Sequence, residues 1–398
     1  MKNLFCILSV FMFAVNTAAA QTVDLASELM NSGIQEKNDD KKKSSTKTIS
    51  KFETSKDENA VADDRGIFSF LNFSFIKKTF SIPDKDEEQE EPAQNLEPTQ
   101  QQNIIQETPL QRKIRRANEG NVDAQLALGY MYLYGEDGVA PDYEQAFKFY
   151  EMAANQNNQI ALNNLGSLYF NGIGTKRDYL KAAQLFELAA KNGSSDAAVN
   201  LAFIYLSSED NQNAHNEAIK LFAQAAQSEN ETAKFMLGYA YYKGFHIEQN
   251  YHKAVELMKA SANAQFDEGQ YILALMYMNG NGIAQNYGNA VNYLKKAASQ
   301  GNLQAMVTLA DILAQGTIYP KNPLHAHIYY NIAAIDNTPH AAERRDAVKS
   351  LLKIDELLQA QSEAENFKPK PSELTLYIRQ TFGPSIRRYI DDNLTNKL

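Results

Sequence analysis

Leucines and small residues recur with a period of 36 through the middle of the chain, and this pattern predicts its architecture. A glycine or an alanine follows each leucine directly, and a tyrosine or leucine comes four positions after it. The leucines are Leu128, Leu165, Leu201, Leu237, Leu273 and Leu309. A period of this length is typical of a solenoid, in which each unit buries its apolar face only against its neighbours.

Within one unit, the spacing of apolar residues predicts two helices. Ala124, Leu128 and Tyr132 lie at i, i+4 and i+8, which places them on one stripe of a first helix. A second helix runs through Ala146 and Tyr150. We therefore expect six helix pairs between residues 121 and 352.

Glycines inside the first helices indicate where these pairs pack most tightly. A glycine in a helix interior costs about 1 kcal/mol relative to alanine. Close contact with the second helix is the expected reason for Gly129, Gly166 and Gly238. A nucleotide-binding interpretation of these glycines fails, because no strand precedes them and no Gly-Lys-Ser/Thr follows.

The units resemble Sel1-like repeats, a branch of the tetratricopeptide-type helical solenoids. The family pattern, A-x-x-x-L-G-x-x-Y-x-x-G-x-G followed by x-A and A-A-x-x-G, is seen best in units two and five, for example in 161–193. Unit three departs most, because 207–211 replaces its glycine pair. The resemblance implies an all-α, right-handed solenoid of six helix pairs and a role in binding other proteins.

The flanking segments predict caps at both ends of the array. Thr108 before Pro109 is a typical helix start, and helices over 341–352 and 354–367 are expected to close the apolar end. The tail 374–394 has the periodicity of an amphipathic helix, which either packs back on the array or docks elsewhere. The expected organisation is a signal peptide (1–20), an arm (21–107) with a Phe-rich island (66–82), an N-terminal capping helix (108–120), the repeats (121–352) and a C-terminal cap and tail (353–398).

The first twenty residues predict export. Lys2 precedes an apolar stretch, and Ala18-Ala19-Ala20 forms a cleavage site before Gln21. An uncleaved anchor is the alternative. Cys6 is the only cysteine and lies in this signal, so the mature chain has no disulfide. We expect a bacterial periplasmic protein, with an extracellular one as the alternative.

The arm is expected to be disordered. Residues 21–109 carry 18 acidic and 11 basic side chains, and their polar tracts cannot bury enough apolar surface to offset the entropy of ordering. Its island is either a docking segment for a partner or for the array, or an incidental aggregation-prone stretch. The candidate docking residues are Phe68, Phe70, Phe73 and Phe75.

The sequence argues against several kinds of chemistry. The repeats are nearly neutral without a basic stripe, which argues against nucleic acid. The basic cluster Arg112, Lys113, Arg115 and Arg116 is either a solvated helix face or a small binding patch. No His-x-x-x-His or Gly-x-Ser-x-Gly motif occurs. We therefore expect no enzyme activity, no metal and no cofactor.

The candidate binding surface is a groove lined by the first helices. Aromatic residues in two columns could hold an extended peptide, because tyrosine brings large contact area and a polar tip; the alternative is that they belong to the ordinary core between units. These residues are Tyr130, Phe203, Phe235, Tyr239 and Tyr271. The expected function is a periplasmic or envelope scaffold. The alternatives are an exported factor that meets host proteins and an enzyme, or non-catalytic subunit, of cell-wall metabolism.

Overall fold

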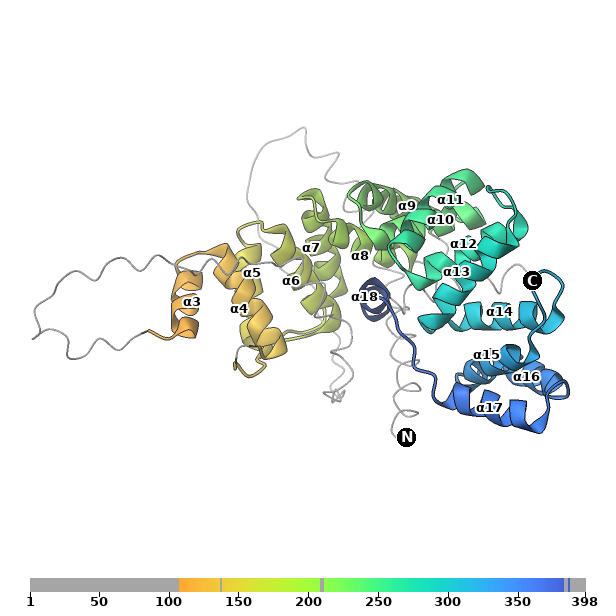
Figure 1. Cartoon of the computed structure of the whole chain (residues 1–398). Coiled ribbons are helices and arrows are strands. Elements are labelled where there is room, and N and C mark those ends of the chain that lie inside the picture. The colour runs from red at the N-terminus through yellow and green to blue at the C-terminus, as the bar shows by residue number, and fades with distance from the viewer. Residues whose placement is uncertain (1–106, 137, 208–210, 383–385, 387–398) are drawn as a thin grey trace, which may run out of the picture. The chain divides into compact units, whose positions relative to one another are not determined.

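The computed structural model describes residues 107–136, 138–207, 211–382 and 386, and within them every regular element is an α-helix (Figure 1). The predicted signal peptide, the arm as far as residue 106 and its four island phenylalanines lie outside the described residues. The helices are α3 (Pro109–Asn118), α4 (Val122–Tyr134), α5 (Tyr143–Ala154), α6 (Gln159–Asn171), α7 (Tyr179–Lys191), α8 (Ser195–Leu206), α9 (Gln212–Gln227), α10 (Glu231–Lys243), α11 (Tyr251–Asn263), α12 (Asp267–Asn279), α13 (Tyr287–Ser299), α14 (Leu303–Gln315), α15 (Pro323–Ile335), α16 (Ala341–Lys349), α17 (Ile354–Glu365) and α18 (Glu373–Thr381).

The six predicted helix pairs are present, from α4 with α5 to α14 with α15. Contacts divide the chain into two compact units. Unit 1 contains α3 to α8 and α9 as far as Ala225. Unit 2 begins at Ala226 and contains α10 to α18.

Short polar side chains define where each first helix begins. The side chain of Asn121 accepts a hydrogen bond from the backbone N–H of Ala124, which satisfies a donor that the helix itself leaves unpaired. Asn158, Ser194, Asn230 and Asn302 occupy the same position and do the same. In the fifth pair this position is Phe266, which makes no such bond.

Close packing inside the first, second and fourth pairs explains the three helical glycines, as the sequence predicts. A Cβ atom on Gly166 would lie 2.8 Å from Cε1 of Phe186, and one on Gly129 would lie 2.9 Å from the ring of Tyr150. Real Cβ atoms do not approach neighbours this closely, so only glycine permits the observed helix spacing. Leu128, fully buried beside Gly129, belongs to the resulting core.

Additional helices cover both ends of the array. In unit 1, α3 packs on α4 and begins with a capping box in which Thr108 and Gln111 bond each other's backbone N–H groups. In unit 2, α16 and α17 pack on α15. The described part of the tail forms α18, which packs on the fifth pair, and for this part the first of the two predicted alternatives is the observed one.

Candidate partner-binding face

One stripe of half-buried side chains runs across the first helices of unit 1, and we call it the unit 1 face. Its positions lie three, four or seven residues apart on α4, on α6, and on α8 with its C-cap residue, so on each helix they share one side. The residues are Ala127, Tyr130, Tyr134, Asn164, Ser167, Asn171, Asn200, Phe203 and Ser207, and each is half-buried.

Amide groups join neighbouring repeats beside this face. Asn200 Nδ2 donates a hydrogen bond to Asn163 Oδ1 at 2.9 Å and so links α8 to α6. Along α6, Ser167 Oγ donates to the carbonyl of Asn163 (3.1 Å) and Asn171 Nδ2 donates to the carbonyl of Ser167 (2.8 Å). The middle of the face is therefore polar and ordered by its own hydrogen bonds.

Aromatic and acidic groups lie at the end of the face formed by the first repeat. The rings of Tyr130 and Tyr134 are 4.7 Å apart at an angle of 50°. Tyr130 Oη donates to Glu136 Oε1 at 3.3 Å. Burial, together with the charge of Glu136, raises the pKa of both phenols, so they remain neutral donors over the physiological range.

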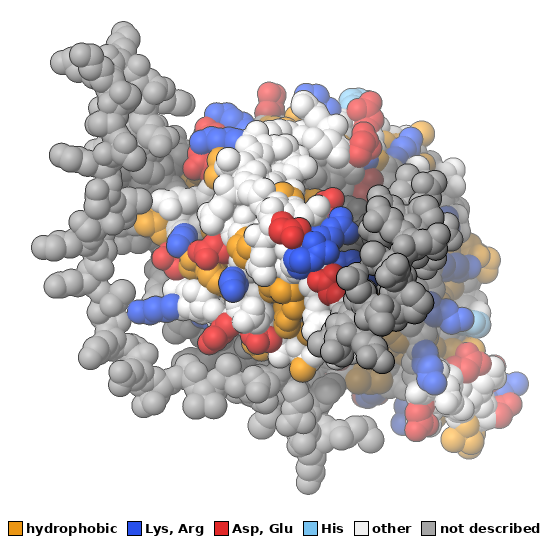
Figure 2. Space-filling model, turned by 90° about the vertical axis from the view of Figure 1, so that its left-hand side faces the viewer, with side chains coloured by type: hydrophobic (Ala, Val, Ile, Leu, Met, Phe, Trp, Pro, Cys, Tyr) orange, Lys and Arg blue, Asp and Glu red, His pale blue; other side chains and the backbone are white. Residues whose placement is uncertain are grey.

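Charge on these helices has one sign. The helices α4, α6 and α8 contain Asp123 and Asp196 but no lysine or arginine. The predicted basic cluster lies on α3, where Arg115 pairs with Glu107 and Glu119. In Figure 2, which views the molecule from the α3 side, acidic and basic side chains are intermixed over the visible described surface.

The five predicted groove residues fall into two environments. Tyr130 and Phe203 lie on the unit 1 face and are half-buried, and Tyr271 of unit 2 is also half-buried. Phe235 is fully buried and Tyr239 is 1% exposed; their rings lie 6.1 Å apart, and Phe235 meets Phe266 edge-on at 5.0 Å. Phe235 and Tyr239 are therefore interior in the described structure, as expected from the alternative that these aromatic residues belong to the ordinary core between units. Binding by any of the five remains a prediction.

In unit 2 the start of α12 is completed by the C-terminal helix. Thr375 Oγ1 accepts from the backbone N–H of Asp267 (3.2 Å) and donates to Gln300 Oε1 (2.8 Å). Ser372 Oγ donates to the carbonyl of Gln265 (2.8 Å). The fully buried carboxylate of Asp267 is paired with Arg379.

Sequence reasoning gave packing of the tail on the array only as one of two alternatives and did not predict where it docks, although one signal pointed to the place. Five of the six first helices begin with an Asn or Ser cap, whereas the fifth has Phe266. A helix start without a side-chain cap needs another acceptor for its N–H groups. Thr375 supplies one from a segment 108 residues away.

Comparison with family models identifies the repeats. The Sel1 repeat model matches residues 122–158, 159–194, 195–230, 232–266, 267–302 and 303–337. The chain belongs to the Sel1 repeat family. The six matches coincide with the six helix pairs. No curated protein matches the chain.

Several solved bacterial structures resemble this Sel1 repeat chain. A protective antigen, c5321, of uropathogenic Escherichia coli has 22% sequence identity and a TM-score of 0.47, with 71% of this chain and 66% of that chain covered. A Sel1 repeat protein from Oxalobacter formigenes has 26% identity and a TM-score of 0.49, covering 57% and 99%. The immunity protein Pa5087 from Pseudomonas aeruginosa has 19% identity and a TM-score of 0.34, covering 54% and 81%. No enzyme family is among these matches.

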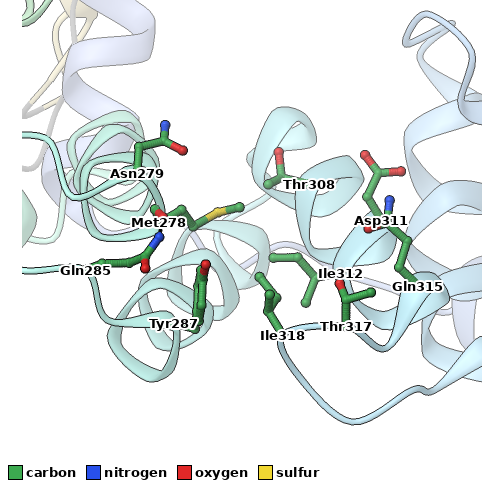
Figure 3. A pocket seen from close by; sticks show the side chains of 10 residues that line it. All are labelled: Met278, Asn279, Gln285, Tyr287, Thr308, Asp311, Ile312, Gln315, Thr317 and Ile318. Atoms are coloured by element: carbon green, nitrogen blue, oxygen red, sulfur yellow. Dashed lines mark hydrogen bonds between the residues drawn. The ribbon is translucent and has the colours of Figure 1, made fainter.

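Between the fifth and sixth Sel1 repeats lies an open cavity of about 520 Å³ (Figure 3). Met278, Asn279 and Tyr287 face it from one repeat, and Thr308 and Asp311 from the other. Asp311 already accepts hydrogen bonds from Tyr330 Oη (2.5 Å) and from Arg344 (2.8 Å). These bonds connect Asp311 on α14 to α15 and α16 and fix the position of its carboxylate.

Two further classes of feature are absent from the described part of the chain. It contains no group of three His, Cys, Asp or Glu side chains placed to hold a metal ion. Among the same residues, no helix combines the length and apolar character that crossing a bilayer requires.

Proposed function

We propose that this protein is a non-enzymatic scaffold of the bacterial periplasm or cell envelope, and that the unit 1 face binds a segment of a partner protein. The observation that carries the proposal is the unit 1 face itself. Its nine positions are half-buried side chains of mixed polar and aromatic character. In the core beneath them, neighbouring positions such as Leu128 and Ala161 are fully buried.

The chemistry of the face suits protein recognition. Tyrosine and phenylalanine bring large contact areas at low entropic cost, and amides bring adaptable hydrogen bonds. Repeat proteins of this kind use successive first helices as one extended surface. The envelope location rests on the signal-like sequence of residues 1–20, with its Ala18-Ala19-Ala20 cleavage site.

Site-specific photo-cross-linking in the native cell tests this function. A benzophenone amino acid replaces Ser167 on the unit 1 face, and in a matched variant it replaces Leu188, which is 39% exposed on the second helix α7. We expect one defined protein adduct from position 167 and none of that identity from position 188.

The same adducts from both positions, or none from position 167, would contradict the proposal. Fractionation of the cells in the same experiment shows whether the chain is exported. Recovery of the unprocessed chain from the cytoplasm would contradict the location.

A further inference from the structure

One loop residue keeps the sixth repeat away from the second helix of the fifth. In the loops after α6 and α12, Gly174 and Gly282 have φ angles of 65° and 70°. A Cβ atom on Gly282 would lie 2.5 Å from the carbonyl carbon of Tyr251, so this contact with the start of α11 requires glycine. Ile318 occupies the same position of the next repeat, and its φ is not positive. The loop after α14 therefore cannot approach Tyr287 in the same way.

The preceding pair of repeats shows what fills the corresponding space there. Met278 lines the cavity between repeats five and six, and Tyr242 is its counterpart in the fourth repeat. The ring of Tyr242 lies 6.0 Å from that of Tyr251. Burial raises the pKa of the Tyr242 phenol, while a hydrogen bond with the Asn281 side chain lowers it. A tyrosine that bonds to the next repeat thus closes this place between repeats four and five.

Both partners of that contact are replaced in the cavity (Figure 3). The counterparts of Tyr242 and Asn281 are Met278 and Thr317. Tyr287 at the start of α13 is 37% exposed, and its ring has no aromatic neighbour among the described residues. The cavity of about 520 Å³ lies within the range of about 300–1,000 Å³ that is typical of ligand sites.

The lining of the cavity suits an aromatic ring that carries a hydroxyl group. Ile312 and Ile318 supply apolar surface, and the sulfur of Met278 can make a favourable contact with a ring edge. The side chains of Gln315 and Thr317 make no hydrogen bond to other described residues. An amide and a hydroxyl each donate and accept, so either can bond a phenol.

Charge in the cavity does not favour an ion. The carboxylate of Asp311 accepts hydrogen bonds from Tyr330 and from the guanidinium of Arg344, so its charge is compensated within unit 2. The other side chains that line the cavity are neutral. A neutral aromatic ligand therefore fits this lining better than a cation or an anion does.

We propose that this cavity binds a tyrosine side chain of a partner protein, whose ring packs against Tyr287 and Met278 and whose hydroxyl bonds to Thr317. The bound tyrosine takes the place that Tyr242 has one repeat earlier. The site lies apart in sequence from the unit 1 face and goes beyond the function proposed for that face. A free phenolic compound is the competing source of the same chemical group.

Binding of N-acetyltyrosinamide, a capped tyrosine, to the full chain tests the site. Methyl NMR of the methionine-labelled chain follows Met278, whose signal is assigned by its loss in Met278→Leu. We expect this signal to shift saturably at millimolar ligand, as suits a ligand of this size. Met236, which is buried in α10, should not shift. The phenylalanine analogue lacks the hydroxyl and should bind at least about threefold more weakly.

A double variant tests the comparison between the repeats. Met278→Tyr with Thr317→Asn rebuilds the contact of Tyr242 with Asn281, so it should raise the melting temperature and abolish ligand binding in saturation-transfer NMR. The control Leu358→Tyr adds a tyrosine at a position that is 60% exposed on α17, and it should change neither quantity. Circular dichroism confirms equal helicity.

A single variant removes only the hydrogen bond. Thr317→Val should weaken the binding of N-acetyltyrosinamide and leave that of the phenylalanine analogue unchanged. This difference between two ligands does not depend on the stability of the variant, so it separates a role in binding from a role in folding.

Cross-linking in the native cell distinguishes a partner protein from a free phenol. A benzophenone amino acid at Gln315 should give a defined protein adduct that is lost in the double variant. Persistence of the adduct in the double variant would contradict the inference. Binding of N-acetyltyrosinamide without any protein adduct at position 315 would instead assign the cavity to a small phenolic ligand and overturn the partner.

Two results in solution would also overturn the inference. They are an unchanged Met278 signal and equal binding of the tyrosine and phenylalanine analogues. Neither result concerns the adduct at position 167, so the proposed function of the unit 1 face stands or falls separately.

Discussion

The first helices of both units have the same repeat pattern, but they differ in how deeply the side that forms the unit 1 face is buried. In unit 1 the stripe on α4, α6 and α8 is half-buried and bonded mainly to neighbouring side chains and backbone. In unit 2, residues 232–240 of α10 are buried without interruption, and the start of α12 is held by α18. A helix buried on all sides has no face left for a partner. In unit 1 the same repeat thus builds a half-buried stripe across three helices. In unit 2 it builds interior structure at α10, while Tyr271 and Leu275 on α12 and Asp311 on α14 stay half-buried.

The difference predicts where the molecule is most sensitive to a single substitution. Arg379→Ala would leave the fully buried carboxylate of Asp267 without its cation. Removal of one partner from a buried ion pair costs about 3–5 kcal/mol, and because Arg379 is 37% exposed we place this pair at the lower end of that range. We expect a loss of that size in the free energy of unfolding, measured by urea titration, with hydrogen exchange showing the loss in unit 2.

An exposed ion pair provides the matched control. Lys220 pairs with Glu217 on the surface of α9, and Lys220→Ala should change stability by less than about 1 kcal/mol. Equal losses of unfolding free energy in the two variants would show that the Arg379–Asp267 pair does not stabilise unit 2. The proposed difference between the two units would then lose its support.

Unit 1 should instead be most sensitive within its core. In Gly166→Val the new side chain would overlap Phe186, whose ring is 2.8 Å from the position of the first added carbon. Overpacking of this kind costs about 2–3 kcal/mol. A circular dichroism melt measures the effect. Gly288→Ala on α13, where the nearest atom is 3.4 Å away, should leave the melt nearly unchanged.

The sequence predicts the close contact at Gly166 but not the docking of α18 on α12. The 36-residue period predicts the helix pairs, and the cost of a helical glycine predicts the close contact at Gly166, because both depend on neighbours in the same or the next repeat. The docking of α18 depends on residues more than 100 positions apart, such as Thr375 and Asp267, and no repeat relates them. Phe266 in a cap position indicates that a side-chain cap is missing. It does not indicate which segment of the chain supplies the acceptor instead.

For the candidate face, too, the sequence predicts the local arrangement but not the tertiary contacts. Tyr130, Phe203 and Tyr239 occupy one column of the repeat, so the sequence places them on the same side of their helices. Whether that side is covered depends on tertiary contacts that differ between repeats. Column position alone therefore could not separate half-buried Phe203 from buried Tyr239.

Thr375 tests whether α18 truly supplies the missing cap. Thr375→Val keeps the volume but removes the oxygen that accepts from the N–H of Asp267. A buried donor left unpaired costs about 1–2 kcal/mol. The control is Ser350→Ala, since the exposed Ser350 Oγ donates to the carbonyl of Ala347 one turn before it, at the end of α16. Chemical denaturation should show a clear loss for the first variant and little for the second; the reverse order would argue against the capping role.

The smallest expected effect is a pH dependence confined to unit 2. His327 on α15 is 2% exposed, and burial together with Arg345 and Lys349 lowers its pKa below 6.5, while Asp346 opposes the shift. The unfolded chain therefore binds a proton more readily than the folded one. The contribution of His327 to stability is complete above about pH 6.5 and falls as the pH drops towards the folded pKa.

Because other groups also titrate, the informative quantity is the difference between the native chain and His327→Gln. Urea unfolding at pH 7.5 and pH 5.5 should show a larger loss of stability in the native chain than in the variant. Hydrogen exchange should place that extra loss in α15 and α16, the two helices that carry His327 and its charged neighbours. Equal losses in both proteins would mean that water reaches His327 in the folded state, and the C-terminal end of unit 2 would then be as accessible as the unit 1 face.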